Sequence, residues 1–195
     1  MDPEYYAPRT HEKMKDVLMN PEAKGPDIHY YMIRGGKERK NITLWQTGTV
    51  DHEYIKTYGH YHVGNLDETY WIIFGEGIAL LQKRALDKKG QPLDDEIEDF
   101  KAIKVNAGDE IYMPAGYAHL LVNTGKTYFV TADNSPVEFL DSVSQGGNEA
   151  SMPGHADYEA VKKMQGFAYY VIEKEGKPVL VKNPKYKKVP DVQLK

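Results

Sequence analysis

The 195-residue chain contains no cysteine, which excludes disulfides, thiolate nucleophiles and zinc sites built on cysteine. It also lacks an apolar run near the ~20 residues of a membrane helix, and its acidic start does not resemble a secretory signal. Positive charge is scarce, because 25 basic residues stand against 29 acidic ones and give a net charge of −4. We therefore expect a cytoplasmic protein without a membrane span or a broad nucleic-acid surface. Any metal ion must be bound by histidine and carboxylate groups.

Tyrosine, in contrast, is abundant, with fifteen tyrosines against five phenylalanines. Such a composition is typical of apolar walls that carry hydroxyl groups, as a pocket for a polyhydroxylated ligand requires. Tyrosine also fills β-strands for packing reasons alone, so composition leaves both interpretations open.

Short segments rich in β-branched and aromatic residues alternate with turn residues along most of the chain. The predicted strands are 28–33, 41–45, 53–57, 69–74, 78–82, 100–105, 110–113, 120–123 and 128–131, followed by a hairpin of 167–173 and 177–182. Short helices are predicted at 11–19 and 157–164. Many strands with little helix between them indicate a β-sandwich or barrel. We expect one domain, with a barrel core over about 28–133, a loop over about 134–155, and a C-terminal helix and hairpin over 156–186.

Two histidines, His60 and His62, stand at positions i and i+2, where an extended strand places both imidazoles on one face. Glu68 follows and opens a strongly apolar segment, which is an unusual place for a carboxylate unless a cation compensates its charge. Together these residues indicate the beginning of a metal site.

A second segment, 108–123, offers a third histidine, His119, just after the Pro-x-Gly turn Pro114-Ala-Gly116. The two segments together resemble the two signature motifs of the cupin family. The resemblance implies an all-β fold, a single jelly-roll-like cupin β-barrel with short N-terminal and C-terminal helices. It also implies that four residues meet inside the barrel around one divalent metal ion: His60, His62, Glu68 and His119.

The spacing of the first motif departs from most cupins, because five residues separate His62 from Glu68. The extra length requires a bulge or a longer turn, and Gly64-Asn65 supplies the backbone freedom for one. Asp67 is a competing carboxylate, but six residues separate Glu68 from the motif glycine, Gly75, as the motif requires. A site of three histidines and one glutamate suits Fe²⁺, Mn²⁺, Ni²⁺ or Zn²⁺, and leaves one or two coordination positions for a substrate.

Beyond the barrel motifs, the chain resembles the archaeal-type, cupin-fold glucose-6-phosphate isomerases over roughly residues 43–186. The resemblance rests on Thr57-Tyr-Gly-His-Tyr-His62, Glu68-Thr-Tyr70, Tyr112-Met-Pro-Ala-Gly-Tyr-Ala-His119 and His155-Ala-Asp-Tyr158. It implies that a sugar phosphate is the ligand, and that such proteins are homodimers. The phosphate is then held by Thr43, Thr57 and Gly59, and the sugar faces Tyr70, His155 and Tyr158.

Two features depart from this family. The loop 134–154 is longer, and an extra residue, Ala156, separates His155 from the Asp-Tyr pair. In addition, the family's tyrosine on an early strand falls at His29, Tyr30 or Tyr31.

The resemblance implies an isomerase of glycolysis and gluconeogenesis that interconverts glucose 6-phosphate and fructose 6-phosphate. Glu68, His155 and Tyr70 are its candidate catalytic residues. Either a carboxylate or His155 removes the C2 proton, or a hydride shifts directly once the carbonyl is polarised, and Glu68 is no free base while it binds the metal. The alternatives are another metal-dependent cupin enzyme, such as an oxygenase or a related sugar-phosphate isomerase, and a cupin that binds sugar phosphates without catalysis.

Overall fold

The computed structural model describes residues 6–35, 41–136 and 155–194, and most of them lie in antiparallel strands. The largest sheet contains, in spatial order, β1 (Tyr6–Thr10), β2 (Ile28–Ile33), β3 (Asn41–Trp45), β12 (Phe129–Asp133), β7 (Glu68–Phe74) and β10 (Glu110–Met113). A second sheet contains β11 (Ala118–Asn123), β8 (Glu76–Leu86) and β9 (Pro92–Asn106). A third contains β15 (Lys177–Lys182), β14 (Tyr169–Lys174), β5 (Glu53–Tyr54) and β4 (Thr49–Val50), and β13 (Ala156–Asp157) pairs with β6 (Tyr61–His62).

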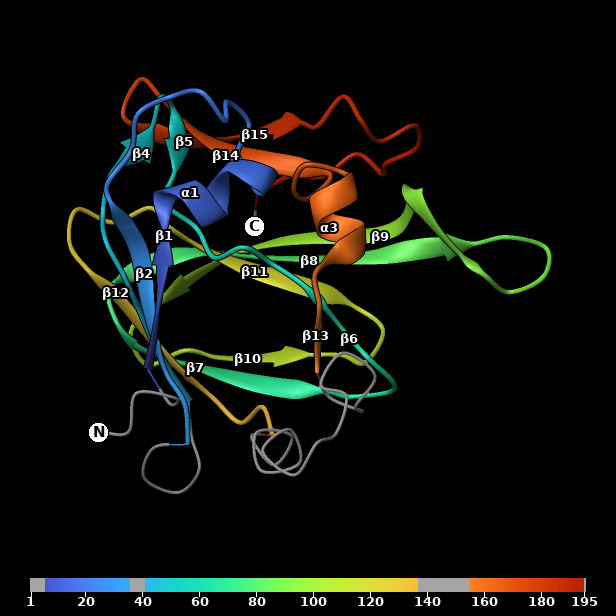
Figure 1. Cartoon of the computed structure of the whole chain (residues 1–195), viewed down its shortest axis with the longest axis horizontal. Helices are drawn as coiled ribbons and strands as arrows, with labels where there is room; N and C mark the ends of the chain where they lie inside the picture. Colours follow the sequence, from blue (N-terminus) through green and yellow to red (C-terminus); the bar gives the residue numbers. More distant parts are fainter. Residues whose placement is uncertain (1–5, 36–40, 137–154, 195) are drawn as a thin grey trace.

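The two larger sheets enclose the interior of the molecule. Figure 1 shows β8, β9 and β11 lying above β7 and β10, while β1, β2 and β12 close the left-hand side. This arrangement confirms the predicted all-β, jelly-roll-like fold with two short helical regions. Because its strands curve around a common interior, side chains from distant parts of the sequence point toward one another there.

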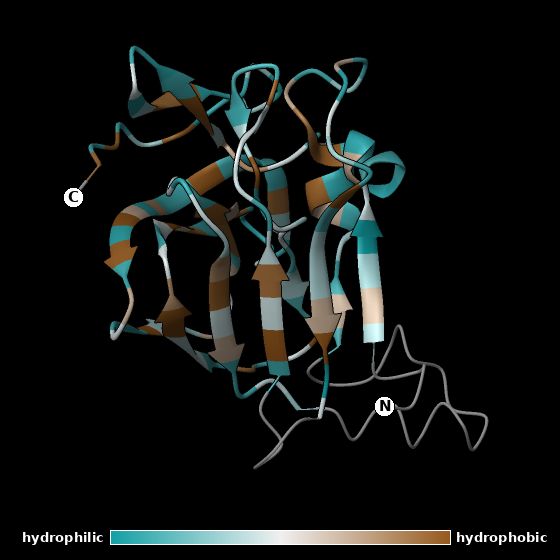
Figure 2. Cartoon of the chain, turned by 90° about the vertical axis from the view of Figure 1, so that its left-hand side faces the viewer, coloured by the Kyte–Doolittle hydropathy of each residue, from teal (hydrophilic) through white to brown (hydrophobic). Residues whose placement is uncertain are grey.

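The core follows from the alternation of side chains along the strands. In β3 the buried positions are every second residue, and Trp45 lies directly opposite Phe129 of β12. Their rings meet edge to face, with centroids 4.9 Å apart and planes at 71°, and both are fully buried. Figure 2 shows apolar and polar bands alternating along the strands of this side of the molecule. The register places one face of each strand in the interior.

The N-terminal region differs from the prediction in two ways. The sequence did not predict β1, which pairs with β2 and carries Arg9 opposite Tyr30. The predicted helix 11–19 is instead a short α1 (His11–Met14) capped by Thr10, followed by the 3₁₀ turn η2 (Lys15–Val17). The helical region ends early because Leu18 adopts an extended backbone conformation. In this conformation the Met19 backbone N–H donates a hydrogen bond to the buried Glu53 carboxylate at 2.7 Å.

Near the C-terminus, the predicted helix is present as α3 (Glu159–Lys163), and the predicted hairpin is formed by β14 and β15. Most of the predicted loop, residues 137–154, lies outside the described residues. The division of the domain into core, loop and C-terminal unit stays a prediction. None of the helices in the described part of the chain has the length and apolar character that a membrane crossing requires.

Candidate metal centre and pocket

Four side chains from three segments of the chain converge between the two larger sheets. Their potential ligand atoms all lie within 4.8 Å of one another, and the residues are His60, His62, Glu68 and His119. The ring centroid of His60 lies 4.7 Å from that of His62 and 4.6 Å from that of His119. Glu68 Oε2 lies 3.2 Å from His62 Nε2 and 3.1 Å from His119 Nε2. We call this set the four-residue cluster. It is the set that the two sequence motifs predicted.

Backbone pairing places these side chains. His60 and His119 form an antiparallel bridge in which the His60 N–H donates to His119 O at 3.3 Å and the His119 N–H donates to His60 O at 3.1 Å. The turn after His62 contains Gly64 with a φ of 80°, a conformation that favours glycine. This turn absorbs the extra residue, so that Glu68 begins β7 buried, whereas Asp67 is exposed.

The electrostatic state of the cluster suits a divalent cation. Burial, together with His119 and His62, lowers the pKa of His60 well below its usual value, so this imidazole is neutral. Burial raises the pKa of Glu68, but His119 and His62 more than offset this effect, and the carboxylate is ionised. The described groups that lie within hydrogen-bonding distance of this carboxylate are the Nε2 atoms of His62 and His119. A buried carboxylate close to imidazole nitrogens, beside the neutral His60 ring, fits a metal ion that uses these groups as ligands.

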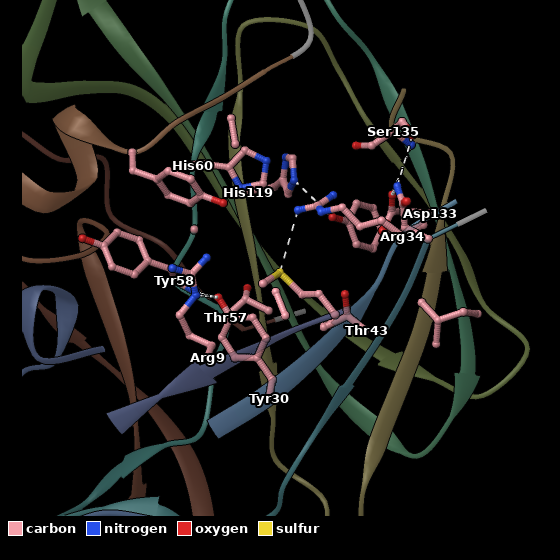
Figure 3. A pocket seen from close by; sticks show the side chains of 18 of the residues that line it. Arg9, Tyr30, Arg34, Thr43, Thr57, Tyr58, His60, His119, Asp133 and Ser135 are labelled. Carbon is pink, nitrogen blue, oxygen red and sulfur yellow. Dashed lines mark hydrogen bonds between the residues drawn. The ribbon is translucent and has the colours of Figure 1, made fainter. Parts of the chain in front are cut away.

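The cluster opens into a cavity of about 280 Å³ (Figure 3). The cavity wall includes all six residues predicted to contact a sugar phosphate: Thr43, Thr57, Gly59, Tyr70, His155 and Tyr158. Gly59 has a φ of 80°, and a Cβ atom there would lie 2.7 Å from Phe167 Cε1, so only glycine fits without a shift. The Thr57 hydroxyl accepts from the Leu121 N–H at 3.1 Å, which fixes it at the wall.

The short strand pair β6 and β13 brings the C-terminal residues to the cluster. Ala156 lies opposite His62, and the Val63 N–H donates to His155 O at 2.9 Å. The Tyr158 ring then lies with its centroid 5.4 Å from that of His60. The extra residue Ala156, a departure from the family pattern, is thus one of the residues that form this pairing.

Tyr70 contributes a protonated hydroxyl next to the cluster. It is buried on β7, and its Oη lies 3.4 Å from His119 Nε2. Burial and the negative charges of Asp133 and Glu68 raise the pKa of Tyr70 well above its usual value. The phenol is therefore available as a hydrogen-bond donor at neutral pH.

Sequence reasoning missed several polar residues of the same cavity, namely Arg9, Arg34, Asn41 and Asp133. Of the three candidates for the early-strand tyrosine, Tyr30 is the one that lines the cavity. The segment that contains Arg9 has no clear strand pattern in its sequence, so neither the strand nor the arginine was predicted. The Asn41–Asp133 contact joins residues 92 apart in sequence and depends on the pairing of β3 with β12.

Asp133 is a buried carboxylate on the wall beside the cluster. Its Oδ1 accepts from Asn41 Nδ2 at 2.7 Å and from the Ser135 N–H at 3.1 Å. Burial and the nearby Glu68 raise the pKa of Asp133 to about 6. The cluster end of the cavity is therefore rich in negative charge.

The fold and the site together define a cupin-like β-protein with a four-residue group that could hold a metal ion. The sequence profile of the glucose-6-phosphate isomerase (GPI) family matches residues 20–189. The chain belongs to this family.

Two relatives illustrate the similarity. A glucose-6-phosphate isomerase of Thermococcus onnurineus is 32% identical over 146 residues, which cover 74% of this chain and 62% of that protein. A glucose-6-phosphate isomerase of Thermococcus litoralis is 29% identical over 188 residues, which cover 89% of this chain and 84% of that protein. The chain thus matches less than two thirds of the first relative's length and most of the second's.

Solved structures give weaker similarity. Bacillus subtilis oxalate decarboxylase aligns with a TM-score of 0.36 and 16% identity, covering 53% of this chain and 24% of that one. CapF of Staphylococcus aureus aligns with a TM-score of 0.37 and 16% identity, covering 57% and 27%.

Proposed function

We propose that this protein is a metal-dependent isomerase that interconverts glucose 6-phosphate and fructose 6-phosphate. The observation that carries the proposal is one cavity that holds both the four-residue cluster and the residues expected to contact a sugar phosphate. Membership of the GPI family supports it. The reaction belongs to glycolysis and gluconeogenesis. A cytoplasmic homodimer stays a prediction.

The cluster supplies the metal site of this proposal. His60, His62, Glu68 and His119 would hold one divalent ion, and Fe²⁺, Mn²⁺, Ni²⁺ and Zn²⁺ all suit three imidazoles and a carboxylate. When bound, such an ion would supply a Lewis acid that polarises the carbonyl group of the open-chain sugar. Glu68 is then occupied as a ligand and is not the free base.

The remaining residues bind and orient the substrate. The Tyr70 hydroxyl, protonated and next to His119, donates a hydrogen bond to a sugar oxygen near C1 and C2. We assign proton transfer between these carbons to His155, an imidazole of the cavity wall outside the four-residue cluster. Thr43, Thr57 and the backbone at Gly59 bind the phosphate group.

The test is the conversion of fructose 6-phosphate by purified protein, before and after chelation and after re-addition of each divalent metal. We expect turnover to disappear on verified metal removal and to return with at least one of the four ions. Unchanged turnover by metal-free protein would exclude the mechanism. Oxygen-dependent turnover of another substrate, with no activity on either sugar phosphate, would favour an oxygenase instead.

A further inference from the structure

Arg9 reaches the cavity from β1 and is surrounded by aromatic rings. Its Nε donates to the Tyr30 hydroxyl at 3.1 Å. The guanidinium carbon lies 5.8 Å from the ring centroid of Tyr30 and 5.6 Å from those of Tyr58 and Tyr158. All four residues line the cavity, and Figure 3 shows Arg9, Tyr30 and Tyr58 next to Thr57. We call Tyr30, Tyr58 and Tyr158 the tyrosine cage.

Among the described residues, Arg9 forms no ion pair with a carboxylate. The acid near the cage is Asp16, which accepts from the Tyr58 hydroxyl at 3.2 Å and is paired with Lys162 at 3.0 Å. The pKa of Arg9 lies above its usual value. Burial acts to lower this pKa, but the interactions with Tyr30 and Tyr158 have a larger, opposite effect. A partly buried cation without a counter-charge is costly, and an anionic ligand relieves that cost.

The other arginine of the cavity is in a different electrostatic environment. Arg34 lies near the Asp133 carboxylate at the cluster end, and its Nη2 donates to Met32 Sδ at 3.8 Å. Its positive charge therefore has an acidic group of the protein nearby. Of the two arginines that line the described part of the cavity, Arg9 is the one whose direct neighbours are tyrosines.

The cage is joined to both of the sites already described. The Tyr158 ring, 5.6 Å from the Arg9 guanidinium, is also 5.4 Å from the His60 ring of the four-residue cluster. The Tyr30 hydroxyl accepts from the Tyr58 N–H at 3.2 Å, which ties the cage to the segment that contains Thr57 and Gly59. A single small ligand can therefore meet the cluster with one end and Arg9 with the other.

We propose that Arg9 binds the phosphate dianion of the substrate and determines the preference for phosphorylated over unphosphorylated sugars. This inference rests on the proposed function and adds a charged residue to the threonines expected at the phosphate. The guanidinium is planar and offers paired N–H donors that match phosphate oxygens, whereas sugar hydroxyls do not need a charge. The tyrosine rings hold the guanidinium in place before the ligand arrives, which lowers the entropy cost of binding.

The experiment measures inorganic phosphate binding to chelated full-length protein by calorimetry, so that it depends on neither metal nor turnover. We expect Arg9→Gln to weaken phosphate binding about 10- to 100-fold, the effect of losing charge-assisted hydrogen bonds. In metal-loaded protein the same variant should raise the KM for fructose 6-phosphate by a similar factor, with a smaller change in kcat. The KM for unphosphorylated fructose should not change.

Arg84→Gln is the matched control, because Arg84 also stacks on a tyrosine, 4.1 Å from the Tyr61 ring centroid, but pairs with Asp94 outside the cavity. It should bind phosphate as the wild type does. If Arg9→Gln does not fold, Arg9→Met, whose unbranched chain fills the cage, should show the same loss of phosphate binding. Wild-type phosphate affinity and KM in a folded Arg9 variant would overturn the inference. Absence of sugar-phosphate turnover by the wild type, with phosphate binding that depends on Arg9, would overturn the isomerase and leave the anion site standing.

Discussion

The two ends of the cavity are built by different principles. The cluster end gathers His60, His62, Glu68 and His119 from strands whose pairing fixes them rigidly, and its charge is negative. At the other end, the cation among the described residues is Arg9, which lies among tyrosines and makes this end positive. A substrate with a carbonyl at one end and a phosphate at the other matches this polarity. Because the two ends depend on different residues, we expect that mutations can separate metal binding from anion binding.

The largest expected effect is the loss of metal binding, without loss of phosphate binding, when one residue of the four-residue cluster is removed. We expect His119→Ala to lower both bound metal and turnover by at least about 100-fold, because direct ligands matter more than the outer residues whose loss costs 10- to 100-fold. Phosphate binding to chelated protein should remain near the wild-type value. Metal content by elemental analysis, turnover and calorimetry check the three expectations.

His52→Ala is the control for this change, since the His52 side chain is 68% exposed and does not line the cavity. It should leave metal content and activity unaltered. Full activity in a metal-free His119 variant would contradict the assignment of the cluster.

A smaller effect should follow from Tyr30→Phe at the cage end. This change removes the hydroxyl that accepts from both Arg9 Nε and the Tyr58 N–H, so the guanidinium loses its anchor. We expect the KM for fructose 6-phosphate to rise about 3- to 10-fold, less than for Arg9→Gln, because the change loosens the guanidinium without removing its charge, with metal content unchanged. Tyr31→Phe is the control, because Tyr31 is the next residue of β2 and stacks on Tyr6 away from the cavity. Loss of metal in Tyr30→Phe would show that the two ends are not separable.

The sequence predicts the cluster end far better than the cage end. His60, His62 and Glu68 lie within nine residues, and His119 follows a Pro-x-Gly turn, so local spacing carries the signal. Arg9 gives no comparable signal, because β1 is a strand only through its pairing with β2. The two-residue strand β13 is likewise defined by its contact with β6 and not by composition.

Local sequence also limits how well the bounds of helices and strands can be predicted. The strands 28–33, 41–45 and 110–113 were predicted with the bounds that the structure has, because these segments are rich in β-branched and aromatic residues. The helix 11–19 was predicted too long, since the contact of Met19 with Glu53, which ends the helical region, joins residues 34 apart in sequence. Tertiary hydrogen bonds of this kind leave no local pattern.

The smallest predicted effect concerns the negative charge of the cluster end and depends on pH. The folded state binds a proton on Asp133 more tightly than the unfolded state, because the pKa rises from 3.8 to about 6. The ionised carboxylate therefore destabilises the fold progressively as pH rises from about 4 to about 6, and by a constant amount above that.

Asp133→Asn removes this penalty while its amide oxygen still accepts from Asn41 and from the Ser135 N–H. Chelated Asp133→Asn should be more stable than the wild type by about 1–3 kcal/mol at pH 7.5, a rise of several degrees in Tm, with the difference shrinking toward pH 4. Thermal unfolding at the two pH values measures it, and Asp191→Asn, at an exposed acid, is the control that should show no such trend. A stability difference that is equal at both pH values would mean that the gain comes from packing, and the cluster end would not carry the buried negative charge that distinguishes it from the tyrosine cage.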